Sequence, residues 1–335
     1  MSSIETSKII GLEEHFVTAP VLAAWEAVEP RWQDLSLMPS RDGATGHRLA
    51  DLGPDRRVAM ADVGVDVQVL SLSTPGVQNL SPEQAVALQT ETNDALAQRV
   101  QSNPDHFQGF ATLATPAPDR AAEELRRAVT TLGLDGAMLF GRTRDRHLDH
   151  RDNWVIFEAA AELNAPLYLH PQSPEPAVRA AYYDGFDPTT NAALATHGVG
   201  WHYETGVQLL RLMVAGVFDR FPELRVITGH WGEMLAFYLD RIDQLTNMAK
   251  LSRKPSEYFR SNVFVTPSGI LSQRYLRWAI EVIGVDRILF AADYPFVPLP
   301  SEAARSFLAD SDLAAADRNL VASGNWERLR SQIRR

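Results

Sequence analysis

Near its start the chain carries the stretch Ile9-Ile10-Gly11-Leu12-Glu13-Glu14-His15-Phe16. The apolar half predicts a buried β-strand, and the polar half follows where that strand ends. An open sheet that binds a dinucleotide would show a glycine-rich turn after its first strand, and the chain has none. Because residues i and i+2 of a strand point the same way, we expect Glu13 and His15 to face one side and Glu14 to face outward.

Short apolar runs alternate with helical patterns along the rest of the chain, which is typical of parallel strands joined by crossover helices. Eight such units in 335 residues predict a (β/α)8 TIM barrel, as one domain over residues 1–335 with an N-terminal tail at residues 1–8. The predicted strands are Ile9–Leu12, Val67–Leu72, Gln108–Leu113, Gly136–Phe140, Pro166–His170, Arg225–Gly229, Asn262–Thr266 and Arg287–Ala291. The predicted helices include Pro82–Val100, Asp119–Leu132, Asp152–Leu163, Thr205–Phe218, Glu233–Met248 and Ser272–Val282.

Two segments are longer than ordinary barrel loops: residues 16–53 after the first strand and residues 171–203 after the fifth. Long loops inside a compact domain are usually lids or assembly surfaces, and the alternative is surface decoration. Both loops carry several aromatic residues that a lone barrel would struggle to bury. We therefore expect a homo-oligomer, a dimer or a tetramer.

Composition excludes several classes of protein. With 45% hydrophobic and 22% charged residues, the chain is typical of globular proteins rather than disordered ones. Its net charge of −10 argues against a nucleic-acid partner, and its one basic cluster reads as a solvated helix end. No stretch has the roughly 20 apolar residues of a membrane span, and the start lacks the features of a signal peptide, so we expect a cytoplasmic protein. The basic cluster consists of Arg328, Arg330, Arg334 and Arg335.

The polar residues at the ends of predicted strands point to a metal site. Glu13, His15, His170, His230 and Asp293 all follow apolar runs, and the carboxyl ends of barrel strands share the face where active sites form. Since the chain has no cysteine, any metal must be held by nitrogen and oxygen, a donor set that suits Zn²⁺ or Mn²⁺. Taken singly, each residue has a simpler explanation, such as a packed histidine or an aspartate that starts a turn.

His230 and Glu233 form a second constellation. If a helix begins near Gly232, the carboxylate can reach back to the imidazole, fix its tautomer and raise its basicity. The alternative is a glutamate that only stabilises the first turn of that helix. His202, beside Trp201 in the fifth loop, is a further candidate for the lining of a pocket.

Four motifs in this order resemble the amidohydrolase superfamily, specifically its metal-dependent aromatic-acid decarboxylases of the γ-resorcylate and 2,3-dihydroxybenzoate type. The resemblance extends from Ile9 to the end of the chain. Two positions depart from that pattern, Gln172 where the family has arginine and Ser73 where it has asparagine. The motifs are Gly11-Leu12-Glu13-Glu14-His15-Phe16, Leu169-His170-Pro171, Gly229-His230-Trp231-Gly232-Glu233 and Ala292-Asp293-Tyr294-Pro295-Phe296.

The resemblance implies a role for each matched residue. Glu13, His15, His170 and Asp293 would hold one divalent metal ion, Zn²⁺ or Mn²⁺. Asp293, His230 and Glu233 would be catalytic, and Phe296, Trp201 and His202 would bind a small aromatic carboxylate. The implied reaction is non-oxidative decarboxylation by a carboxy-lyase that releases CO2. Two alternatives remain: a metal-dependent hydrolase of a lactone, ester or amide, and a barrel that has lost its metal and only binds.

Overall fold

The computed structural model describes residues 7–335, so residues 1–6 of the expected N-terminal tail lie outside the described part. Parallel strands form two hydrogen-bonded groups, in the orders β1-β2-β3 and β10-β9-β8-β5-β4. A short antiparallel hairpin, β6 (Arg142–Thr143) with β7 (Arg146–His147), follows β5. The parallel strands are β1 (Ile10–Phe16), β2 (Val67–Leu72), β3 (Phe107–Gly109), β4 (Ala111–Thr112), β5 (Ala137–Phe140), β8 (Leu167–His170), β9 (Val226–Thr228) and β10 (Val263–Val265).

Two irregular connections join these groups into a ring. Phe110 alone separates β3 from β4, and its N–H donates to Leu70 while the N–H of Ala111 donates to Gly136. The predicted strand Arg287–Ala291 is not a regular strand. Instead, its segment makes isolated bridges to β10 at Ile288 and to β1 at Phe290 and Tyr294. The expected eight parallel segments therefore follow one another around a ring, the arrangement of a (β/α)8 barrel.

A β-bulge in β1 sets the direction of the polar side chains. Gly11 pairs with Gln68 but Glu14 pairs with Leu70, so β1 holds one more residue than β2 over this interval. Ile10 and Leu12 belong to the apolar cluster inside the barrel. Because of the extra residue, Glu13 and His15 also point inward, where they meet the other two predicted ligands, His170 and Asp293. The Glu14 side chain packs against Gly11, where a Cβ would lie 2.3 Å from the carboxylate. Glu14 points away from Glu13 as predicted, but it is buried and does not reach solvent.

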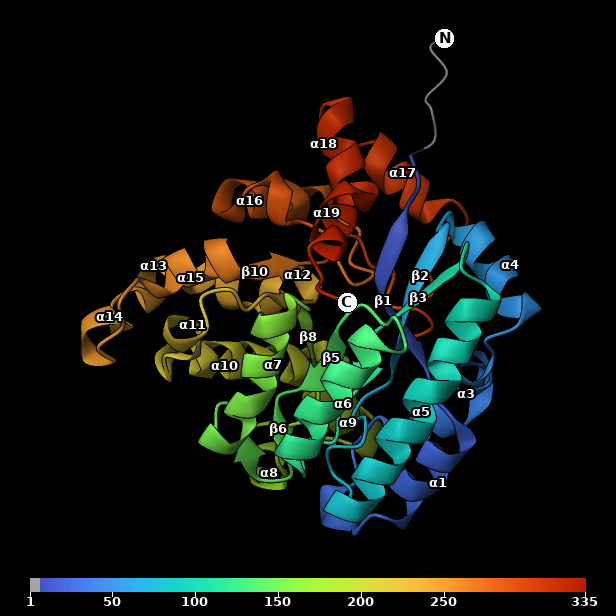
Figure 1. Ribbon diagram of the computed structural model, residues 1–335, viewed down its shortest axis with the longest axis vertical. Coiled ribbons are helices and arrows are strands. Elements are labelled where there is room, and N and C mark those ends of the chain that lie inside the picture. The colour runs from blue at the N-terminus through green and yellow to red at the C-terminus, as the bar shows by residue number, and fades with distance from the viewer. Residues whose placement is uncertain (1–6) are drawn as a thin grey trace.

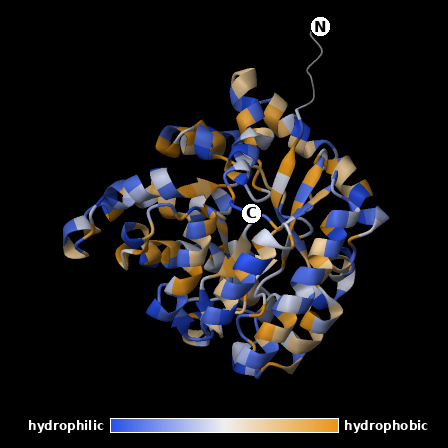
Figure 2. Cartoon of the chain, in the orientation of Figure 1, coloured by the Kyte–Doolittle hydropathy of each residue, from blue (hydrophilic) through white to orange (hydrophobic). Residues whose placement is uncertain are grey.

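The barrel has an inner and an outer apolar layer. The inner cluster includes Val67, Val69 and Phe110, and helix α19 (Asn325–Ser331) adds Trp326 to it. Figure 1 shows α19 near the centre of the view, over the strands. The outer cluster fills the space between the strands and the helices. In Figure 2 the apolar colour runs along β1 and β2, while the surrounding helices carry polar stretches. No helix of residues 7–335 is long and apolar enough to span a membrane.

The crossover helices agree with the sequence pattern, with one exception. The predicted continuous helix Glu233–Met248 is wrong: its first two residues have a positive φ, which a right-handed helix cannot contain, and short helical pieces follow them. The pieces there are α12 (His230–Glu233), η4 (Leu235–Tyr238), α13 (Leu239–Ile242) and α14 (Leu245–Met248). The other long helices are α4 (Pro54–Val63), α5 (Pro82–Ser102), α6 (Pro118–Thr130), α7 (Trp154–Leu163), α10 (Gly200–Val214), α15 (Pro255–Asn262) and α16 (Gln273–Ile283).

The two long loops are folded and touch each other. Asp34, from the first loop, accepts hydrogen bonds from the backbone N–H and the hydroxyl of Ser173 at 2.9 and 2.8 Å. Ser173 lies at the start of the second loop, directly after the β8 end that carries His170. The helices of the first loop are α1 (Ala19–Ala27), η1 (Pro30–Trp32), α2 (Leu37–Arg41) and α3 (Gly43–Ala50). Those of the second are α8 (Pro176–Tyr182), α9 (Pro188–Ala193) and η3 (Leu194–Gly198).

Candidate metal centre

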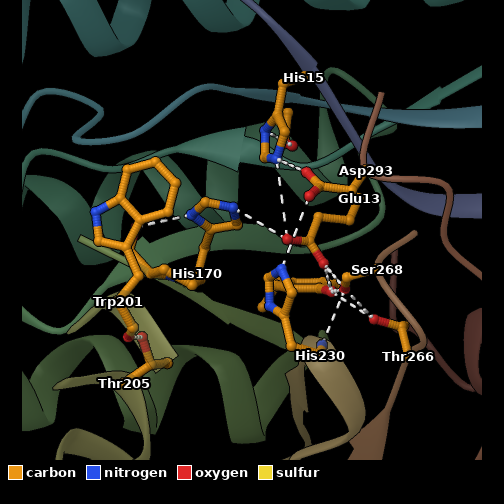
Figure 3. Close-up of polar contacts among 12 residues, drawn as sticks. Glu13, His15, His170, Trp201, Thr205, His230, Thr266, Ser268 and Asp293 are labelled. Carbon is orange, nitrogen blue, oxygen red and sulfur yellow. Dashed lines mark hydrogen bonds and ion pairs between the residues drawn. The ribbon is translucent and has the colours of Figure 1, made fainter. Parts of the chain in front are cut away.

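The four predicted ligands lie together at the carboxyl ends of the strands. Glu13 and His15 come from β1, His170 is the last residue of β8, and Asp293 follows the irregular eighth segment. One ligand atom from each residue lies within 4.8 Å of all the others, and all four residues are buried. Figure 3 shows His15, His170 and Asp293 arranged around the carboxylate of Glu13. Nε2 of His15 lies 3.5 Å from Oδ1 of Asp293 and 4.0 Å from Oε1 of Glu13.

Two ligand atoms at the centre of this cluster have no hydrogen-bond partner within the described residues: Oε1 of Glu13 and Nε2 of His15. His170 turns a third atom toward them. Its Nδ1 lies 2.8 Å from the carbonyl oxygen of Pro171, which can only accept, so Nδ1 carries a hydrogen. Its Nε2 faces the cluster and lies 3.0 Å from Oε1 of Glu13. Converging lone pairs of nitrogen and oxygen fit one divalent cation, which would satisfy all of them at once.

The second oxygen of Glu13 is held by hydroxyl groups. Oε2 accepts hydrogen bonds from Tyr168 and Ser268, and Thr266 bonds to both of those hydroxyls at 2.8 Å. Thr266 and Ser268 end the strand predicted at residues 262–266 or follow it directly, and their hydroxyls orient Glu13. Tyr168 was missed, although it precedes His170 by two residues and so shares its face of β8. These hydroxyls fix which carboxylate oxygen faces the other ligands.

The charges within the cluster follow from burial and from the neighbouring imidazoles. Burial alone would raise the pKa of Glu13, but the positive charge of His230 and the adjacent imidazoles of His170 and His15 outweigh it and hold the pKa well below its usual range. Burial lowers the pKa of His15, which favours the neutral ring that a metal ion requires. Burial and the charge of Glu13 raise the pKa of Tyr168, so its hydroxyl keeps its proton and donates it.

A second group, His230, Glu233 and His202, lies next to the first. Nδ1 of His230 is 2.7 Å from Oε1 of Glu233, and Nδ1 of His202 is 2.8 Å from Oε2. The predicted contact between His230 and Glu233 is present, although a left-handed turn rather than a helix start makes it. Burial opposes the charge on His230, but Glu233 and Glu13 raise its pKa well above the usual value. Nε2 of His230 lies 3.7 Å from Oδ2 of Asp293, which connects the two groups.

The predicted substrate-binding residues occupy different surroundings. The ring of Phe296 packs edge-on against His15 with 5.4 Å between the ring centroids. Trp201 lies beside His170 in Figure 3, and its indole nitrogen donates to the hydroxyl of Ser173. His202 has no free ring nitrogen, because Nε2 lies 3.2 Å from the carbonyl oxygen of His197. Phe296 therefore packs against a member of the ligand cluster, Trp201 is bonded to the segment that follows His170, and His202 adjoins Glu233.

One departure from the family pattern has a structural explanation. Gln172 is buried, and its side chain accepts from the N–H of Arg142 and donates to Asn79, both at 3.3 Å. It therefore joins the end of β5 to the end of β8 within the protein. Ser73, the other departure, is buried with a hydroxyl that has no hydrogen-bond partner in the part of the chain described.

Comparisons with known proteins agree with this geometry. A family model described as amidohydrolase matches residues 22–329. The γ-resorcylate decarboxylases of Polaromonas sp. and Rhizobium sp. are 35% and 33% identical to this chain, and each alignment covers 96% of this chain and 97% of the relative. The solved structure of 5-carboxyvanillate decarboxylase from Novosphingobium aromaticivorans, with bound manganese, has a TM-score of 0.89 and 30% identity, and the match covers 98% of each chain. The predicted fold class is confirmed, and the chain belongs to the amidohydrolase family.

Proposed function

We propose that this protein is a metal-dependent carboxy-lyase that removes CO2 from a hydroxylated, benzoate-like aromatic acid. The observation that carries the proposal is the contact between its two groups of polar residues. Asp293 belongs to the four-ligand cluster and also lies 3.7 Å from His230 of the proton-handling pair. A cation site and an acid–base pair that meet at one carboxylate are what this decarboxylation requires. The names of the relatives, which are decarboxylases of dihydroxybenzoate and carboxyvanillate acids, support the substrate class.

Glu13, His15, His170 and Asp293 would hold the metal ion, which supplies positive charge to bind the substrate carboxylate together with an ortho hydroxyl. We propose Zn²⁺ or Mn²⁺, and manganese is present in the structures of two similar decarboxylases. Nε2 of His170, which faces the cluster, and the unpartnered oxygen of Glu13 support this assignment.

In the proposed mechanism, Asp293 gives a proton to the ring carbon that carries the carboxylate. The bond between that carbon and the carboxylate then breaks, its electrons return to the ring, and CO2 leaves. His230, held by Glu233, polarises or deprotonates the phenolic hydroxyl and so raises the electron density at the carbon that is protonated. Phe296 and Trp201 lie where they can flank the aromatic ring.

The proposal has two further parts. We propose that residues 1–335 act as one domain and that the protein is a homo-oligomer, since the second long loop exposes Tyr182 and Phe186. A location in the cytoplasm stays a prediction from the sequence. Sedimentation measurements would test the oligomeric state.

One purified sample tests the reaction. It would be assayed for CO2 release from 2,6-dihydroxybenzoate and related hydroxybenzoates, and in parallel for hydrolysis of aromatic esters and lactones. We expect CO2 release only, and we expect Asp293→Asn to abolish it while leaving the protein folded. Hydrolysis without CO2 release would favour the hydrolase alternative. If elemental analysis found no metal and Asp293→Asn kept full activity, the proposed metal-dependent mechanism would be wrong.

A further inference from the structure

Glu233 lies in a stretch of unusual backbone conformation. Residues 230–234 have φ values of 48°, 61°, 90°, 51° and 65°, and only the third of them is glycine. Side-chain-bearing residues rarely adopt this left-handed region, and a run of them persists only when surrounding contacts enforce it. Two contacts come from the barrel: the N–H of Trp231 donates to Thr266, and its indole nitrogen donates to Ile270. Neither of these contacts touches the carboxylate of Glu233.

Helix α10 contacts Glu233 at both its side chain and its backbone. Nδ1 of His202 lies 2.8 Å from the carboxylate oxygen Oε2. One helical turn later, Gly206 packs against the carbonyl oxygen of the same glutamate, and a Cβ at Gly206 would lie 2.4 Å from that oxygen. Residues four apart share one face of a helix. The face of α10 that carries His202 and Gly206 therefore fixes both ends of Glu233.

The hydrogen-bond pattern shows what His202 does there. The histidines on both sides hold the pKa of Glu233 below its usual range against the effect of burial, so the carboxylate is ionised and can only accept. Nδ1 of His202 and Nδ1 of His230 must each carry the hydrogen of their bond to it. Nε2 of His202 faces the carbonyl oxygen of His197, which also only accepts. Both ring nitrogens of His202 therefore face oxygen atoms of the protein, and neither is left to face a substrate.

We propose that His202 and Gly206 of α10 are positioning residues for the Glu233–His230 pair, and that His202 does not bind the substrate. The bond to His202 occupies one carboxylate oxygen of Glu233, which leaves the other aimed at Nδ1 of His230. With Nδ1 of His230 bonded to Glu233, Nε2 is the ring nitrogen that faces Asp293 and the substrate. This inference rests on the proposed function, because it gives the pair its role in that reaction.

Two substitutions at His202 test the inference. His202→Leu removes the donor, whereas the side-chain amide of His202→Asn places an N–H near the former Nδ1. We expect His202→Leu to lower kcat about 10- to 100-fold, because a small displacement of a catalytic group costs about this much, and to leave KM nearly unchanged. We expect His202→Asn to recover most of the lost kcat. If both substitutions instead raise KM with kcat unchanged, His202 contacts the substrate and the inference is wrong. Full activity of His202→Leu would also overturn it.

Gly206→Ala tests the backbone contact, with Val214→Ala at the exposed end of the same helix as its control. The new methyl group must push the carbonyl oxygen of Glu233 away, so we expect kcat to fall about tenfold or more in Gly206→Ala. We expect no change in Val214→Ala. Equal activity of the two folded variants would contradict the role of Gly206. If Gly206→Ala does not fold, the His202 pair still decides the inference.

A measurement without substrate separates this inference from the proposed function. NMR of protein labelled with ¹⁵N at histidine reports whether each ring nitrogen of His230 carries a hydrogen and how it is bonded. We expect Nδ1 of His230 to keep its hydrogen and its bond to Glu233 in the parent and in His202→Asn, and the Nδ1 signal to shift in His202→Leu. An unchanged Nδ1 signal in His202→Leu would overturn the positioning role even in an active enzyme. If the parent releases no CO2 from any acid tested, the proposed function fails, while the NMR result still stands.

Discussion

Glu13 and Glu14 are neighbours in β1, and both are completely buried, yet their carboxylates have opposite surroundings. Glu13 faces imidazoles, which hold its pKa well below the usual range, and one of its oxygens lacks a partner. Glu14 accepts from the N–H of Ala292 and from the amide of Gln68. Burial raises the pKa of Glu14 to about 8, against the opposing effects of that N–H and of Arg56. Strand geometry alone separates the two environments.

The side chains on the two sides of β1 therefore make different kinds of contact. On the Glu13 side, ligand atoms of four residues converge, and Oε1 of Glu13 has no hydrogen-bond partner among residues 7–335. On the Glu14 side, Arg56 donates to Gln68 at 2.6 Å and to the carbonyl oxygen of His15 at 2.8 Å, and it lies over the ring of Tyr294. These contacts join β1 to the segment that carries Asp293. A buried carboxylate therefore indicates a metal site only when its neighbours leave one of its oxygens without a hydrogen-bond partner.

Metal removal should produce the largest effect. After dialysis against a chelator we expect decarboxylation to disappear, and we expect Mn²⁺ or Zn²⁺ to restore it, because the lone pairs around Glu13 need a cation to bind the substrate carboxylate. Activity assays with metal analysis of the same samples would check this. If a sample without measurable metal kept its activity, the Glu13 side of β1 would not be a metal site and the two sides would not differ in function.

The substitutions Glu13→Gln and Glu14→Gln compare the two sides directly. Glu13→Gln removes a charged ligand, so we expect kcat/KM to fall about 10³-fold or more along with the metal content, since a metal ion supplies several kcal/mol to such reactions. Glu14→Gln keeps the shape and an acceptor for Ala292, so we expect it to retain most of the parent's metal and activity. Equal losses in both variants would show that the two carboxylates are not functionally separate.

Tyr168→Phe tests whether a neighbouring hydroxyl positions the carboxylate of Glu13. It removes one of the two hydroxyls that orient Oε2 of Glu13, and changes of this kind beside a metal site cost about 10- to 100-fold in metal affinity or activity. Tyr258→Phe is the matched control, because that buried tyrosine bonds to Asp219 instead. Titration of both metal-free variants with Mn²⁺ would measure the difference. Identical affinities would mean that the hydroxyl of Tyr168 does not position Glu13.

The smallest predicted effect concerns pH and stability. Since the pKa of Glu14 is raised from 4.5 to about 8, the folded protein keeps a proton that the unfolded chain releases in this range. The contribution of Glu14 to the free energy of unfolding is thus complete below about pH 4.5 and is lost as the pH rises through about 8. In the metal-free parent we expect a decline on the order of a few kcal/mol, which Glu14→Gln should lack. Urea unfolding at several pH values would measure it. Parallel pH profiles for the two proteins would contradict the raised pKa.

The sequence predicts most of the ligand set because strand periodicity is a local property. A barrel brings the ends of its strands to one face, so Glu13, His15, His170 and Asp293 can be grouped from their positions alone. Tyr168 could have been included by the same two-residue rule. Ser268 could not be assigned to Glu13, because its contact joins residues 255 positions apart and depends on how the irregular eighth segment joins β10 to β1.

By itself, then, the amino-acid sequence determined the (β/α)8 pattern, the absence of thiolate ligands and the residue types at the strand ends. The tertiary structure decided the bulge that turns Glu13 inward, the burial of Glu14 and the left-handed turn at residues 230–234. It also decided that His202 lies within hydrogen-bond distance of Glu233. The physical reason is that local patterns specify ordinary backbone, whereas left-handed residues and buried charges depend on contacts between distant segments, such as that of Gly206 with Glu233.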